Sequence, residues 1–123
     1  MTPQELRIGN LVQYKGEVVK VELINKKKIG YHMEENKSWL CYARLVEIEP
    51  IPLTEEIIGK YFIHHGASYY RDNSRVEIYQ TRYGWCLSVN NSPYTAYINT
   101  IVEYLHELQN AYYMANQKEL TII

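Results

Sequence analysis

The stretch EPIPLTEEII, residues 49–58, marks the point where a run of β-strands ends and a helix begins. Proline has no backbone N–H and cannot donate to a sheet ladder, so the two prolines end the preceding strand. Thr54 then serves as a helix N-cap, and two glutamates follow it in the first turn, where the helix dipole favours negative charge. We therefore divide the chain into residues 1–53 and 54–123, which we expect to form one compact domain.

The residues before this junction predict a series of short strands. A capping box, Thr2-x-x-Glu5, predicts a helical turn at the start of the chain. Short β-rich runs separated by polar turns then predict strands at residues 10–14, 18–24, 29–33, 38–42 and 45–49. Strands this short at such close spacing predict a small antiparallel β-barrel or a strongly bent sheet.

The residues after the junction predict a short helix, an antiparallel β-meander and a C-terminal amphipathic helix, which makes the chain α+β. The meander strands are expected at residues 62–65, 67–71, 75–81, 85–89 and 94–98. Apolar residues then recur at helical spacings, at Ile101, Leu105, Leu108, Tyr112 and Ala115. We expect this helix to begin at a second capping box, Thr100-x-x-Glu103, and to end at Asn116 as its C-cap.

Two segments at the ends of the chain have a recognisable pattern. They read QELRIGNLVQYKGEVVKVELI, residues 4–24, and YLHELQNAYYMANQKEL, residues 104–120. Together with the proline junction, they resemble a family of short uncharacterised proteins from gut-bacterial genomes and their prophages or mobile elements. The chain departs from that pattern at Ala111 and Met114, and it lacks the glycine expected after the last helix. The resemblance implies an SH3-like small barrel followed by an α+β segment, and it implies no activity.

Composition narrows the classes of function. The net charge of −1 predicts neither a nucleic-acid-binding protein nor a basic membrane-surface protein. No apolar run approaches the roughly 20 residues of a membrane helix, and the start of the chain has no signal-peptide pattern. We therefore expect a cytoplasmic protein without a membrane partner. Cys41 and Cys86 each lie in an apolar run, which predicts buried small side chains rather than a disulfide.

No motif predicts catalysis, a metal or a cofactor. The glycines are scattered and form no phosphate-binding loop. His64 and His65 are adjacent, so in a strand they point to opposite faces and do not bind one ion together. Cys41 or Cys86 beside a histidine would give a small hydrolase-type enzyme, but no local signature supports that alternative. We predict no catalytic residue, no metal site and no cofactor.

Tyrosine is the unusual residue in this composition, with 13 Tyr against one Phe and two Trp. A tyrosine ring packs like phenylalanine and keeps a hydroxyl for a partner, and tyrosine is enriched in interface hot spots. In each adjacent tyrosine pair one ring points inward and one outward, which makes Tyr70 and Tyr113 candidates for a protein interface. We therefore predict a non-enzymatic accessory or protein-binding module of mobile-element origin, acting through a protein partner or self-association.

Nucleic-acid binding is the alternative prediction. A basic hairpin tip and three nearby aromatic residues could contact phosphates and stack on bases: Lys26, Lys27, Lys28, Tyr31, Trp39 and Tyr42. A sparser set of cations surrounds Asp72, at Arg71, Arg75 and Arg82. The opposing interpretation is a solvated loop beside an ordinary aromatic core, which the net charge of −1 favours.

Overall fold

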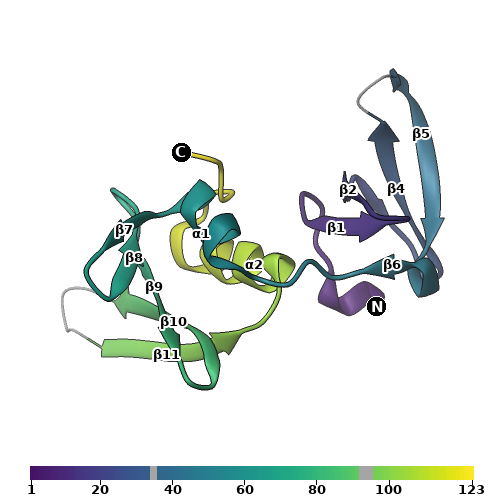
Figure 1. Ribbon diagram of the computed structural model, residues 1–123. Helices are drawn as coiled ribbons and strands as arrows, with labels where there is room; N and C mark the ends of the chain where they lie inside the picture. Colours follow the sequence, from purple (N-terminus) through teal and green to yellow (C-terminus); the bar gives the residue numbers. More distant parts are fainter. Residues whose placement is uncertain (34–35, 92–95) are drawn as a thin grey trace. The chain divides into compact units, whose positions relative to one another are not determined.

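The computed structural model describes residues 1–33, 36–91 and 96–123, without the side chains of residues 36–37, 90–91 and 96–99. The chain divides into two compact units, Met1–Ile51 and Pro52–Ile123, which we call unit 1 and unit 2 (Figure 1). The division falls inside the proline junction. The fold is α+β, with antiparallel sheets and a C-terminal helix, α2 (Leu105–Asn116), as the sequence predicted.

Unit 1 contains two three-stranded antiparallel sheets in its described part, with strand orders β2-β1-β6 and β3-β4-β5. Its elements are the 3-10 helix η1 (Pro3–Glu5), β1 (Leu11–Tyr14), β2 (Glu17–Lys20), β3 (Leu23–Ile24), β4 (Lys28–Met33), β5 (Asn36–Arg44), the 3-10 helix η2 (Leu45–Glu47) and β6 (Ile48–Glu49). The described strands do not close into a barrel, so the predicted barrel is found only as two separate sheets.

Two predicted strands of unit 1 are interrupted where the chain passes from one sheet to the other. The strand expected at residues 18–24 is divided by Val21, whose N–H bonds to Asn10, and by Glu22, whose N–H bonds to Gly30. The strand expected at residues 45–49 begins as η2, and only β6 pairs with β1. The backbone must bend where it leaves one sheet and enters the other, and a regular continuous strand does not bend sharply enough.

The core of unit 1 lies among these strands. Its buried residues are Leu6, Val12, Val19, Val21, Ile29, Tyr31, Ala43, Leu45 and Ile48. The β1-β2 hairpin turns at Lys15 and Gly16, whose φ angles of 51° and 81° both lie in the left-handed region. Two such residues form the tight turn whose twist matches the flanking strands.

Unit 2 consists of one five-stranded antiparallel sheet and two helices on the same side of it (Figure 1). Its elements are α1 (Glu55–Tyr61), β7 (Ile63–His65), β8 (Ser68–Tyr70), β9 (Val76–Thr81), β10 (Gly84–Asn91), β11 (Ala96–Val102) and α2, and the sheet order is β11-β10-β9-β8-β7. The short helix is confirmed with its cap, because Thr54 Oγ1 accepts a hydrogen bond from the Ile57 N–H at 3.2 Å. The predicted antiparallel meander is confirmed, but its last strand, expected at residues 94–98, is found as β11, and residues 94–95 lie outside the described part of the chain.

The start of the C-terminal helix was predicted wrongly. Thr100 and Ile101 belong to β11, where Ile101 pairs with Cys86, and the helix begins only after the N-cap Tyr104. The true N3 residue is Glu107, whose Oε1 accepts the N–H groups of Glu103 and Tyr104, both at 3.0 Å. Pairing with β10 extends the strand and overrides the helical periodicity of the local sequence.

The end of α2 also differs from the prediction. Gln117 is the C-cap, with a left-handed φ of 60°, and Asn116 is the last helical residue. The Asn116 side chain instead accepts the Arg75 N–H at 3.0 Å and donates to the Tyr112 carbonyl at 3.2 Å. This side chain ties the turn before β9 to the end of the helix.

The core of unit 2 lies between the sheet and its two helices. The buried sheet residues include Val76, Ile78, Leu87 and Val102, and the buried helix residues include Ile58, Tyr61, Leu105, Leu108 and Tyr112. The Phe62 and Tyr112 rings meet edge to face, with centroids 6.3 Å apart. In the described part of the chain, no helix combines the length and apolar character needed to span a bilayer.

Candidate functional site

The face of the unit 2 sheet that points away from the helices is defined by strand alternation. Val76 and Ile78 are buried on the helix side, so Glu77 and Tyr79 point to the opposite side. The pairing register extends this side across the sheet in two rows. The rows are Ile63, Tyr70, Glu77 and Ser88, and His65, Ser68, Tyr79, Cys86 and Ile101. We call these nine residues the outer sheet face.

The outer sheet face has substantial apolar character. Ile63 is 38% exposed and Ile101 is 49% exposed, while Tyr70 and Tyr79 are half-buried beside them. Tyr83, in the hairpin between β9 and β10, is 73% exposed. Antiparallel sheets commonly expose one face to water, and the residues on that face are then mostly polar. Here aliphatic and tyrosine side chains occupy strands from one edge of the sheet to the other.

A polar contact lies at the centre of this face. The Cys86 thiol donates to the Tyr79 hydroxyl, with sulfur and oxygen 3.3 Å apart. This hydrogen bond raises the pKa of the Tyr79 phenol above its ordinary value, with desolvation as a further cause. Cys86 is buried and Cys41 is half-buried, and both are free thiols.

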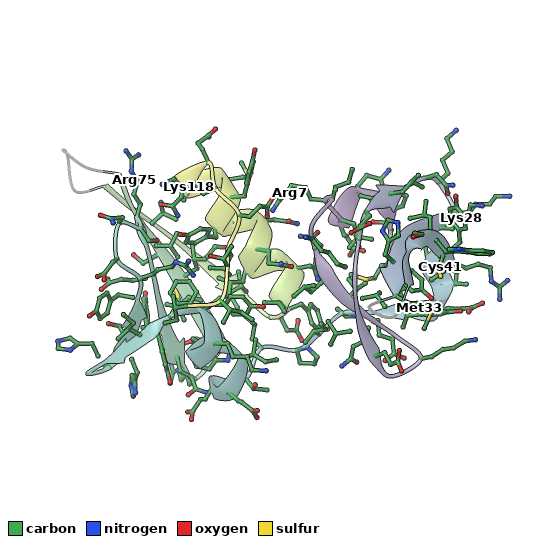
Figure 2. All side chains as sticks on the ribbon, turned by 90° about the horizontal axis from the view of Figure 1, so that it is seen from above. Arg7, Lys28, Met33, Cys41, Arg75 and Lys118 are labelled. Carbon is green, nitrogen blue, oxygen red and sulfur yellow. The ribbon has the colours of Figure 1, made fainter. Side chains whose placement is uncertain are left out.

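A pocket of about 550 Å³ opens beside the first row of the outer sheet face. Its lining from the sheet includes His65, Tyr70, Glu77 and Ser88, and its lining from the turn before β9 includes Arg71, Ser74 and Arg75. The Arg75 side chain is exposed and projects from this turn (Figure 2). Two guanidinium groups therefore line a pocket that contains one carboxylate.

Arg71 also holds the end of the chain. Its Nη1 donates to the Tyr61 carbonyl at 3.2 Å and to the Thr121 carbonyl, and its Nη2 donates to Thr121 Oγ1 at 2.7 Å. The guanidinium carbon lies 5.8 Å from the centroid of the Tyr112 ring. These partners are neutral, so they do not cancel the charge of Arg71.

The basic tip predicted in unit 1 exists as a tight turn. The Asn25 side-chain oxygen accepts the N–H groups of Lys27 and Lys28, both at 2.9 Å. Lys26 and Lys27 are exposed, and the Lys28 ammonium lies 4.2 Å from the centroid of the Tyr42 ring. Lys28 is one of the labelled side chains of unit 1 (Figure 2).

The structure separates the aromatic residues that the sequence grouped with this tip. Tyr42 is 49% exposed and lies beside Lys28, whereas Tyr31 is 9% exposed and packs in the core. Burial raises the pKa of the Tyr31 phenol and removes its ring as a stacking surface. Trp39 is 71% exposed, but it lies where the β4–β5 register shifts and has no ladder partner in β4, whereas Tyr42 pairs with Gly30.

The two tyrosines predicted for a protein interface lie on different surfaces. Tyr70 lies on the outer sheet face and lines the pocket, whereas Tyr113 is 37% exposed on α2, on the other side of the sheet. Only Tyr70 therefore belongs to the outer sheet face. Ile101 was missed as a surface residue because the sequence analysis assigned it to a helix. The β-branched run from Thr100 to Val102 is typical of strands and was the available signal.

The histidines and cysteines do not converge. Among residues 1–33, 36–91 and 96–123, no group of three or more His, Cys, Asp or Glu side chains is placed to hold a metal ion. His64 stacks on Tyr69, with ring centroids 4.4 Å apart, while His65 lies on the outer sheet face. The His32 ring contacts the Glu22 carboxylate in unit 1.

Comparison of the chain with family models, with curated proteins and with solved structures finds no match. The functional argument therefore depends on the chemistry of these surfaces.

Proposed function

We propose that this protein is a binding module that docks a protein partner on the outer sheet face of unit 2. The observation that supports this proposal is the exposed isoleucine at the end of the second row: Ile101 is 49% exposed. The other side of the same sheet is packed against two helices. Tyrosine and aliphatic side chains lie on four of the five strands and reach both edges of the sheet, about 19 Å apart at the usual strand spacing. Such a face, apolar at several positions and polar around them, matches the composition of protein interfaces.

Site-specific photo-cross-linking tests this docking face. A benzoylphenylalanine replaces Ile101 in one variant and Met114 in the control, which is 80% exposed on α2. We expect adducts from position 101 and none from position 114, since only the former lies on the outer sheet face. An adduct formed by the purified protein identifies a second copy as the partner, and one formed only in a lysate of its source cells identifies another protein. Absence of adducts from position 101 in both experiments contradicts the proposal.

Nucleic-acid binding by unit 1 is the second candidate. The observation that favours it is a cluster of cationic and aromatic side chains. The Lys28 ammonium lies over the Tyr42 ring, and Lys28 of β4 pairs across the ladder with Arg44 of β5. Against it, Arg44 is already paired with Glu47, and unit 1 has eight Lys and Arg against seven Glu. The Lys28 side chain also covers one side of the Tyr42 ring.

Fluorescence anisotropy with a labelled single-stranded oligonucleotide distinguishes the two candidates. If unit 1 binds nucleic acid, affinity falls steeply with added salt, because phosphate contacts release counterions. Replacing Lys26 and Lys27 by Glu then abolishes binding, whereas replacing Lys60 and Lys118 of unit 2 does not. The protein-docking proposal predicts no salt-sensitive binding by any of these proteins.

We further propose that unit 1 is a partly open SH3-like barrel and that the protein is an accessory module of a mobile element. The return of β6 onto β1 after the 3-10 turn η2 supports the barrel proposal, because it brings the end of unit 1 back to its first strand. The mobile-element proposal is supported by the resemblance of the two terminal segments. An experimental structure of the full chain tests the first proposal. Hydrogen bonding between a strand of the β2-β1-β6 sheet and a strand of the β3-β4-β5 sheet would support the barrel, and its absence would contradict it.

A further inference from the structure

The pocket beside the outer sheet face contains more hydrogen-bond donors than its own residues use. Ser74 Oγ accepts the Val76 N–H at 3.0 Å and an amide N–H of Asn116 at 3.5 Å, so its hydroxyl hydrogen remains for another acceptor. Ser88 is 8% exposed and lines the same pocket, so a second hydroxyl lies beside that of Ser74. Serine hydroxyls each carry one donor hydrogen, so both groups can donate to an acceptor that enters the pocket.

The charges of the pocket indicate which kind of acceptor it binds. Among the described residues, no carboxylate lies within ion-pair distance of the Arg75 guanidinium, and Glu77 is the one carboxylate in the lining. Arg71 contacts neutral oxygens and the Tyr112 ring. Two guanidinium groups against one carboxylate leave the pocket positive, and a guanidinium binds oxyanions through planar, paired N–H groups.

We propose that this pocket binds an oxyanion, a carboxylate or a phosphate presented by the side chain of the protein partner. Arg75 is the primary contact, Ser74 and Ser88 donate hydroxyl hydrogens, and Arg71 adds charge from the back of the turn. The proposal depends on the docking function above and narrows its partner to an acidic or phosphorylated protein segment. The neighbouring Tyr70 ring would lie against the aliphatic part of that segment.

Nuclear magnetic resonance titration of the full-length protein tests the pocket without a partner. The probes are inorganic phosphate and N-acetylglutamate amide, added at constant ionic strength while the backbone amides of Ser74, Arg75, Glu77 and Ser88 are observed. We expect saturable shifts at these amides. Saturation by phosphate alone identifies a phosphorylated segment, and saturation by the glutamate derivative as well identifies an acidic one.

Two variants and a control make the test specific. Arg75→Gln should weaken binding about tenfold, the loss expected for one charge-assisted hydrogen bond, and Ser88→Ala should weaken it in the same direction. Arg82→Gln is the control, because its guanidinium lies 4.9 Å from the centroid of the Tyr83 ring in another turn. Shifts that do not saturate, an unchanged affinity in Arg75→Gln, or an equal loss in Arg82→Gln would overturn the proposal.

The pocket titration and the cross-linking experiment at position 101 can fail independently of each other. If position 101 cross-links to a partner but the pocket binds neither probe, the docking function stands and the oxyanion site is wrong. If the pocket binds a probe and position 101 gives no adduct, the site is retained and the docking face is wrong.

Discussion

Gly30 shows how the absence of one side chain permits close packing in unit 1. A Cβ atom at this position would lie 3.0 Å from Leu23 Cβ and 3.1 Å from Leu40 Cδ1. Leu23 Cβ is attached directly to the backbone of β3 and cannot swing away. We therefore expect Gly30→Ala to lower the free energy of unfolding by about 1–3 kcal/mol through overpacking.

Urea unfolding measures the stability of this variant, and the matched control is Gly59→Ala in α1. A Cβ atom at Gly59 would meet nothing within 4 Å, so Gly59→Ala should raise the free energy of unfolding by about 1 kcal/mol, since alanine favours the helix. Equal stability of Gly30→Ala and the unchanged protein would show that β3 and β5 do not pack this closely.

Glu47 gives a pH-dependent prediction at the same scale. The hydrogen bond from Arg44 Nε to Glu47 Oε1, 2.6 Å long, lowers the pKa of this carboxyl below its ordinary value. The ionised carboxylate therefore stabilises the fold above the pKa of the unfolded chain, and this contribution is lost as the pH falls through the folded pKa. Arg44→Gln should raise the pKa of Glu47 toward its ordinary value.

The measurement is a carbon-detected titration of the Glu47 carboxyl between about pH 2 and pH 7. Tyr14→Phe is the comparison, because the Tyr14 hydroxyl lies 3.4 Å from Glu47 Oε2 and contributes less to the shift. A larger change in Tyr14→Phe than in Arg44→Gln would contradict the assignment of the cause.

At the scale of single elements, the start of α2 depends on one side chain. Glu107 accepts the backbone N–H groups of Tyr104, the N-cap, and of Glu103, the residue before it. Glu107→Ala should therefore lower the free energy of unfolding by about 1 kcal/mol, and Glu107→Gln, which keeps an acceptor oxygen, should lower it less. Thermal and urea unfolding measure both values. Equal losses in the two variants would mean that charge, rather than the hydrogen bonds, stabilises this helix end.

The elements that the sequence predicted well are those set by neighbouring residues. Thr54 caps α1 through a residue three positions away, and Lys15 with Gly16 turns the first hairpin. The errors occur where distant strands compete for the same residues. Ile101 fits a helical spacing with Leu105, but its ladder with Cys86 keeps it in β11.

At the scale of the whole molecule, the two units predict two separable responses to core mutation. Ile29 in unit 1 and Leu108 in unit 2 are both fully buried. Each change to alanine should cost about 2–5 kcal/mol, through lost burial and the cavity left behind. Because each residue lies in the core of its own unit, we expect Ile29→Ala to speed amide exchange in residues 1–51 and Leu108→Ala to speed it in residues 52–123.

Native-state hydrogen exchange measures both patterns in the full-length protein. The conservative variants Ile29→Val and Leu108→Met should produce the same patterns with smaller amplitudes. Parallel loss of protection in both units after either change to alanine would show that the chain unfolds as one cooperative body.

The α+β class, the antiparallel strands, the proline junction and the capped start of α1 follow from the sequence alone. Turns, caps and strand alternation depend on residues a few positions apart, so a local pattern contains them. The division of unit 1 into two sheets, the length of β11 and the uncovered face with its pocket were decided by the tertiary structure. Those features arise from pairing and packing between residues far apart in the sequence: Ser88 pairs with Glu77 across the ladder, and Arg71 donates a hydrogen bond to Thr121. No local pattern specifies which of the distant residues pair.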